Sequence, residues 1–138
     1  MQGFVADIEQ LTLENSNFRK VLYTGKNLQL VLMTLQPGED IGEEKHDDRD
    51  QFFRVEQGYG EIMIDGHRSE VKADDAMIVP AGAMHNVINR GDQPLRLYTL
   101  YGPPEHREGT VHVTKDDAEK QEEHFDGRTT EQFDQLSN

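Results

Sequence analysis

The chain has 138 residues, a length typical of one domain and too short for two ordinary ones. It contains no cysteine, which excludes disulfides, thiolate metal ligands and a cysteine nucleophile. The formal net charge is −13, and an acidic surface repels phosphate backbones and anionic lipids. We therefore expect neither nucleic acid nor a membrane as a partner.

Targeting signals are not visible in the sequence. The opening residues MQGFVADIEQ show no basic region and no apolar run. No segment approaches the roughly 18 consecutive apolar residues of a membrane span. We therefore expect a cytoplasmic protein.

The elements divide the chain into three parts. Residues 1–17 have a mixed pattern that predicts an N-terminal arm containing a short helix or irregular structure. From Phe18 onward, short runs of β-branched, aromatic and leucine residues alternate with turn signals, which is typical of strands. The predicted strands are 18–24, 27–36, 51–57, 60–65, 68–72, 76–79, 85–89 and 94–101. Many short strands without intervening helices predict an all-β antiparallel sandwich or small barrel over residues 18–104.

The remaining segment, residues 105–138, has a different character. Thr114 is followed three residues later by Asp117, which resembles a capping box and predicts a short acidic helix from Asp116 to His124. Beyond it only Phe125, Phe133 and Leu136 are large apolar residues. We expect that end to be frayed or docked on a neighbouring molecule.

Two segments carry candidate metal ligands. Glu44 and His46 are two residues apart, so they share one face of a strand. Gln51 shares a face with Phe53 and Val55, whose apolar character marks that face as inward. A pair at i and i+2, followed across a turn by a third residue, lets ligands converge from several directions.

The second segment contains His85, which shares a face with Val87. The turn at Pro80, Ala81 and Gly82 brings His85 back across the barrel toward the first segment. Glu44, His46, Gln51 and His85 are therefore the candidate ligands of one site.

Together these segments resemble the paired motifs of the cupin superfamily. The first cupin motif reads G-x5-H-x-H-x3-4-E-x6-G, and Gly38, Glu44, His46, Gln51 and Gly58 stand at its spacing. The second reads G-x5-P-x-G-x2-H-x3-N. At its positions stand Asp74, Pro80, Gly82, His85 and Asn89. The wider sequence is similar to stand-alone bacterial cupins described as mannose-6-phosphate isomerase-like. The resemblance implies a double-stranded β-helix (a jelly-roll barrel) with a short C-terminal helix, and it implies a homodimer.

The departures from the pattern concern the metal. Glu44 replaces the first histidine and Gln51 replaces the glutamate, so the implied ligands are one carboxylate, two imidazoles and one amide oxygen. Such a set suits one divalent transition metal ion, Mn, Fe, Co, Ni or Zn, without choosing among them. Alternatively, Gln51 lies outside the direct ligands and hydrogen-bonds a bound water. A third reading is a barrel that holds no metal.

The sequence indicates the function less closely than the fold, because one fold can support many different reactions. The first hypothesis is a metal-dependent enzyme acting on a small polar molecule, with sugar isomerase or epimerase-type chemistry implied by the resemblance. The second is a metal-dependent dioxygenase, and the third is a non-catalytic barrel that binds a small molecule or metal. Catalytic residues are not predicted. Arg49 and Arg54 are the cations near the motifs, and three C-terminal histidines are not assigned to the metal: His106, His112 and His124.

Overall fold

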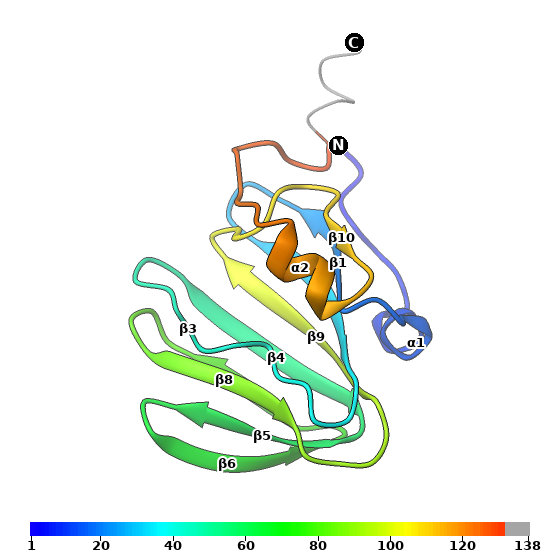
Figure 1. Cartoon of the computed structure of the whole chain (residues 1–138). Coiled ribbons are helices and arrows are strands. Elements are labelled where there is room, and N and C mark those ends of the chain that lie inside the picture. Colours follow the sequence, from blue (N-terminus) through cyan, green and yellow to red (C-terminus); the bar gives the residue numbers. More distant parts are fainter. Residues whose placement is uncertain (132–138) are drawn as a thin grey trace.

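The computed structural model describes residues 1–131, which form two antiparallel sheets packed face to face (Figure 1). The larger sheet has the strand order β10-β1-β2-β9-β4-β7, and the smaller has the order β3-β8-β5-β6. This is the predicted all-β jelly roll. The elements are α1 Ile8–Glu14, β1 Arg19–Thr24, β2 Gln29–Leu35, β3 Glu44–Lys45, β4 Asp50–Gln57, β5 Tyr59–Ile64, β6 His67–Lys72, β7 Ala76–Val79, β8 Met84–Asn89, β9 Leu95–Gly102, β10 Val111–His112 and α2 Lys115–Lys120.

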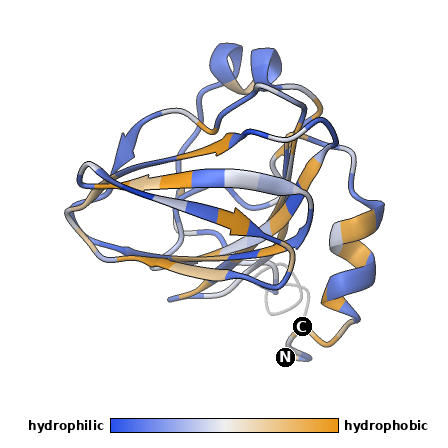
Figure 2. Cartoon of the chain, turned by 90° about the horizontal axis from the view of Figure 1, so that it is seen from below, coloured by the Kyte–Doolittle hydropathy of each residue, from blue (hydrophilic) through white to orange (hydrophobic). Residues whose placement is uncertain are grey.

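The core follows from the two-residue period of the strands. Along β9, Leu95 and Leu97 are fully buried, whereas Arg96 and Tyr98 are partly exposed. Figure 2 shows the resulting change between hydrophobic and hydrophilic colour along the strands. Val87 of β8 and Ile62 of β5 complete the core from the smaller sheet. The inner faces of both sheets therefore supply one continuous core.

One end of this core is polar. Strands β4 and β9 are antiparallel, so Val55 lies opposite Leu97 at one end and Gln51 lies opposite Tyr101 at the other. Gln51 and Tyr101 are as deeply buried as the apolar residues, at 2% and 1% exposure. The inward rows thus change from aliphatic to hydrogen-bonding side chains toward this end of the barrel.

All eight predicted strands are present, with boundaries that differ by at most a few residues. The sequence did not predict β3 or β10. Each has only two residues, and each is defined by its partner strand rather than by a pattern of its own. Glu44 pairs with His85 of β8, and His112 pairs with Arg19 of β1. The segment after Pro104 therefore contributes a strand to the larger sheet.

The helix α2 begins as predicted and ends earlier. Thr114 accepts a hydrogen bond from the Asp117 amide, and the Asp117 side chain accepts one from the Thr114 amide, which is the predicted capping box. The helix ends at Lys120 rather than at His124. Beyond it the Phe125 amide donates to the Glu105 carbonyl at 2.9 Å, and such contacts with the barrel replace the helical hydrogen bonds.

The expectation of a frayed or intermolecular end is wrong for residues 125–131. The Thr130 amide donates to the Thr24 carbonyl at 2.9 Å, so this segment docks on the barrel of its own chain. Phe133 and Leu136 lie outside the described residues. At the other terminus α1 is capped by the Asp7 side chain, which accepts from the Gln10 amide. Within residues 1–131 no helix has the length and apolar character that crossing a membrane requires.

Candidate metal centre

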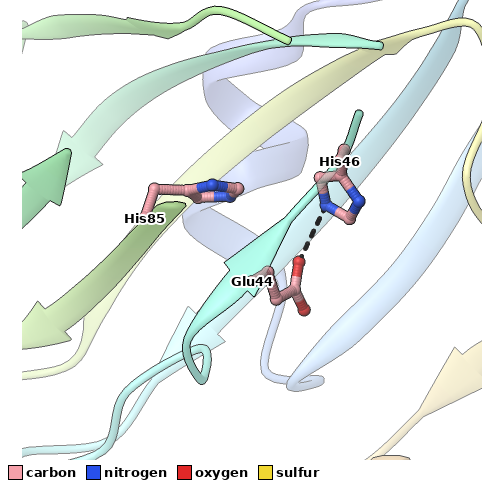
Figure 3. A group of neighbouring side chains, drawn as sticks. All are labelled: Glu44, His46 and His85. Carbon is pink, nitrogen blue, oxygen red and sulfur yellow. Dashed lines mark hydrogen bonds and ion pairs between the residues drawn. The ribbon is translucent and has the colours of Figure 1, made fainter. Parts of the chain in front are cut away.

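The two-residue strand β3 brings the candidate ligands together. Glu44 lies directly opposite His85 in the β3–β8 ladder, and His46 follows one residue after β3 ends. Figure 3 shows the three side chains converging between the strands. One ligand atom from each of Glu44, His46 and His85 lies within 4.8 Å of the other two. A single ion can therefore contact all three.

His85 presents a free nitrogen lone pair. Its Nδ1 lies 3.3 Å from the Ala83 carbonyl oxygen and so carries the proton. The Nε2 is buried and has no hydrogen-bond partner in the part of the chain that the structure describes. Burial lowers the pKa of His85, which keeps the imidazole neutral. A buried neutral imidazole with an unsatisfied lone pair fits a metal ligand.

Glu44 and His46 share a hydrogen bond, with 3.0 Å between Oε2 and Nε2. Burial acts to raise the pKa of Glu44, but the hydrogen bond and positive charge of His46 outweigh it and lower that pKa. The same hydrogen bond is the main cause that raises the pKa of His46. The pair thus holds one proton where a cation would bind, and a metal ion would displace that proton.

The other nitrogen of His46 is oriented by a pair that the sequence did not reveal. His46 Nδ1 lies 3.5 Å from Glu105 Oε2, and the Arg49 guanidinium forms an ion pair with the same carboxylate. Ligand histidines commonly use their second ring nitrogen in this way, which fixes the tautomer. Arg54, the other cation near the motifs, lies on the outer face and pairs with Asp74 and Glu56.

Gln51 is buried at the polar end of the barrel. Its Nε2 donates to Thr99 Oγ1 at 3.0 Å, and that hydroxyl in turn donates to the Phe52 carbonyl at 2.8 Å. The amide oxygen of Gln51 is left without a donor among residues 1–131. An unpaired buried oxygen is destabilising unless something else fills its hydrogen-bonding capacity. The role of Gln51 as a ligand stays a prediction.

A cavity of about 310 Å³ opens beside Glu44 and is bounded by β1, β10 and the segment around α2. His106 and His112, which the sequence did not place at the site, line this cavity, although they are outside the group formed with His46 and His85. They reach it because β10 pairs with β1 and because residues 105–106 follow β9 directly.

A chain of contacts joins this cavity to the barrel interior. His106 Nε2 lies 3.3 Å from the Tyr101 hydroxyl, and its Nδ1 lies 2.7 Å from Glu123 Oε1. The ring of Tyr101 meets the ring of His46 edge to face, with centroids 6.0 Å apart. Burial is the main cause that raises the pKa of Tyr101, so its hydroxyl stays protonated and donates. Glu123 therefore ties the C-terminal segment to the residues that surround the site.

Replacing Glu123 with glutamine is expected to destabilise the protein near neutral pH by about 1.5–3 kcal/mol, the scale of a hydrogen bond to a charged group. Burial acts to raise the pKa of Glu123, but the hydrogen bond from His106 lowers it below its ordinary value of 4.5. A carboxyl group with a lowered pKa contributes stability above its unfolded pKa and loses it as the pH falls. Urea unfolding at pH 7 and at pH 3.5 should show the difference shrinking in acid. Glu122→Gln, at an exposed neighbour, is the control, and equal losses at both pH values would contradict the account.

The donor set defines which metals fit. Two imidazoles and one carboxylate with further positions open form the arrangement found in mononuclear iron sites, and the same donors accept Mn, Co, Ni and Zn. The neutral His85, the outer carboxylate behind His46 and the open cavity all fit a bound divalent ion. The residues therefore fit one transition metal ion, and they do not select its identity.

Comparisons with known proteins agree with this fold. The family model described as "Cupin domain" matches residues 31–101. The uncharacterized protein YrkC of Bacillus subtilis (strain 168) is 49% identical over 121 residues, which cover 83% of this chain and 65% of YrkC. The chain thus spans slightly less than two thirds of that relative. The uncharacterized protein L612 of Acanthamoeba polyphaga mimivirus is 37% identical over 119 residues, covering 83% of this chain and 74% of L612. The crystal structure of BH2720 from Bacillus halodurans superposes with a TM-score of 0.85 at 46% identity, covering 87% of this chain and 96% of BH2720.

Proposed function

The chain belongs to the cupin family, and we propose that it is a metal-dependent enzyme that acts on a small polar molecule. Glu44, His46 and His85 would hold one divalent transition metal ion, with Gln51 as a fourth ligand or as the partner of a bound water. The observation that carries this proposal is the convergence of the three ligand atoms within 4.8 Å beside a cavity of about 310 Å³. A site of that size suits a small molecule.

When bound, the metal would supply a Lewis acid that polarises an oxygen of the substrate. The chain's own residues would position this chemistry. Glu105 fixes the ring of His46 through Nδ1, and the Ala83 carbonyl fixes the ring of His85. The Tyr101 hydroxyl is buried and protonated, so it is a donor rather than a base. Groups locked by such contacts lose little freedom when a substrate binds.

Within this class we favour oxygen-independent conversion of a small polyol or sugar, as the mannose-6-phosphate isomerase-like resemblance implies. A phosphorylated sugar is less favoured, since Arg49 is paired with Glu105 and Arg54 is paired on the outer face. Neither arginine is free to clamp a phosphate.

A metal-dependent dioxygenase is the second candidate. It is favoured by the two-histidine, one-carboxylate set, which is the arrangement of non-haem iron oxygenases. Cupin oxygenases of this kind, however, place the carboxylate after the first histidine of the motif, whereas Glu44 precedes His46. Ligand binding without turnover is the third candidate.

The experiment uses untagged protein reconstituted separately with Mn, Fe, Co, Ni and Zn. Each form is incubated with a panel of small sugars and hydroxy acids, and products are followed by NMR under argon and in air. Turnover under argon that is lost in Glu44→Gln is the expected result. Turnover that requires air would favour the dioxygenase. Stabilisation by a panel compound without turnover by any metal form would leave a binding protein and contradict the proposal.

A further inference from the structure

Arg19 is a buried cation on the inner face of the larger sheet. It lies at the start of β1, two residues before the core residue Val21, and only 7% of it is exposed. Its side chain lines the same cavity as Glu44. An arginine at an inward strand position is unusual, because transfer of a charge from water into the interior is unfavourable unless the charge is paired.

Its partners among residues 1–131 leave one donor of the guanidinium unsatisfied. One terminal nitrogen, Nη1, donates to His112 Nδ1 at 3.1 Å, and the guanidinium carbon lies 5.3 Å from the centre of the Phe18 ring. Burial and the charge of Arg19 both lower the pKa of His112, so this partner is a neutral imidazole. The Arg19 Nε is buried and has no acceptor among the described residues. One of the five N–H donors of this guanidinium is therefore buried without an acceptor.

Two other charged residues of the cavity wall, Lys115 and Glu105, are already paired. Lys115 forms an ion pair with Asp40, and Arg49 forms one with Glu105. Of the cations in this cavity wall, within residues 1–131, Arg19 has no carboxylate at ion-pair distance.

The acids nearest to Arg19 do not supply the carboxylate partner that it lacks. Its charge contributes to lowering the pKa of Glu44 and of Glu123, but Glu44 is engaged by His46 and Glu123 by His106. The remaining acids of the cavity wall, Glu43, Glu119 and Glu122, are exposed. A divalent ion on Glu44 would give the inner wall, beside Arg19, a net positive charge. The part of the cavity beside Arg19 would therefore attract an anion.

We infer that Arg19 anchors an anion subsite and that the small polar molecule bound in this cavity carries a carboxylate, so that a polyol or sugar substrate would be an acid derivative. The inference rests on the proposed function for the rest of the ligand, which would lie between Arg19 and the metal. The planar guanidinium can donate two parallel hydrogen bonds to a carboxylate, whose geometry matches it. A phosphate group carries more charge and is usually bound by several cations, whereas among residues 1–131 the lysine and arginine of this cavity wall leave only Arg19 without a carboxylate partner, beside exposed acids.

The test compares acids with their neutral amides by isothermal titration calorimetry. Acetate, lactate and succinate are titrated beside acetamide, lactamide and succinamide into the full chain, both metal-free and Zn²⁺-loaded, with the metal content measured in each preparation. We expect at least one acid to bind about tenfold or more tightly than its amide, as loss of a charged hydrogen-bonding partner implies. Inorganic phosphate is titrated in parallel.

Arg19→Met keeps the length of the side chain and removes the charge. It should lose the preference for the acid while keeping its metal content, and Lys20→Met, at the exposed neighbouring position, should behave like the wild type. Arg19→Lys keeps the charge but lacks the planar guanidinium. Its preference for the acid over the amide should lie between those of the wild type and Arg19→Met. The melting temperature of Arg19→Met should match or exceed that of the wild type, because a buried unpaired charge is removed.

The outcomes separate this inference from the metal proposal. Acid preference in the metal-free protein, lost in Arg19→Met, would support the subsite even if no metal bound. Full metal content with no acid bound more tightly than its amide would overturn the subsite and leave the metal site intact. Tighter binding of phosphate than of any acid would overturn the assignment to a carboxylate. If Arg19→Met fails to fold, the inference is tested by two other results. These are the affinity of the wild type for each acid against its amide, and the smaller preference expected in Arg19→Lys.

Discussion

Replacing His85 with alanine is expected to weaken the binding of Zn²⁺ or Co²⁺ by at least about 100-fold. Loss of an outer-shell partner alone commonly weakens metal binding by about 10–100-fold, and His85 would be a direct ligand. Its Nε2 is the buried nitrogen that no other described group uses. Removing it would leave Glu44 and His46, whose side chains hydrogen-bond each other.

The measurement is a competition titration against a chromophoric chelator. His67→Ala is the matched control, because His67 is an exposed histidine on β6 with one contact to the Ile64 carbonyl. It should bind metal as the wild type does. Equal affinities for His85→Ala and His67→Ala would show that His85 is not a ligand.

The second large effect is expected at Gly58, the last glycine of the first motif. Its φ is +103°, and a Cβ added there would lie 2.7 Å from the Pro94 carbonyl oxygen and 3.0 Å from the Leu95 Cα. Those neighbours are backbone atoms that cannot move without shifting β9. Gly58→Ala should therefore lower the free energy of unfolding by about 2–6 kcal/mol, since backbone strain and overpacking each contribute about 1–3 kcal/mol.

Gly38→Ala separates these two contributions. Gly38 also has a positive φ, +84°, but an added Cβ would meet nothing within 4 Å. Gly38→Ala should lower the free energy of unfolding by about 1–3 kcal/mol, from backbone conformation alone. Chemical denaturation of both variants measures the difference. A Gly38→Ala variant as unstable as Gly58→Ala would refute the role of the close approach between the β4–β5 connection and β9.

Asp74 shows how a departure from the motif is accommodated. It stands where the second cupin motif has a glycine, and its φ is +77°, so the position keeps the left-handed conformation. Aspartate adopts this conformation more readily than most residues. Its carboxylate also accepts a hydrogen bond from Arg54. The substitution therefore changes the turn residue and leaves the turn geometry in place.

The strands were predictable because their signal is local. Alternation along β4 and β9 and glycine-rich turns between strands depend only on neighbouring residues. Strands β3 and β10 could not be found this way, because Glu44–Lys45 and Val111–His112 are strands only through pairing with β8 and β1. The end of α2 depends likewise on contacts with the barrel, including the hydrogen bond from Phe125 to Glu105.

The residues of the site likewise fall into those predicted from local sequence patterns and those placed by contacts distant in sequence. The motifs were enough to predict that Glu44, His46 and His85 meet, because i and i+2 residues share a strand face and the turn at Pro80, Ala81 and Gly82 returns His85 toward them. Glu105 and Glu123 were not predicted, since they reach the site through a segment whose path the sequence did not reveal. Arg19 had a usable signal: it shares the inward face of β1 with Val21, and a cation at such a position marks a candidate binding residue.

The central claim is that Glu44, His46 and His85 hold one metal ion, and elemental analysis of untagged protein tests it most directly. The wild type and a Glu44→Ala/His85→Ala double variant would be purified side by side and measured by ICP-MS, as isolated and after reconstitution. We expect about one equivalent of a transition metal in the wild type and almost none in the double variant. No metal in the wild type after reconstitution, or the same content in both proteins, would contradict it.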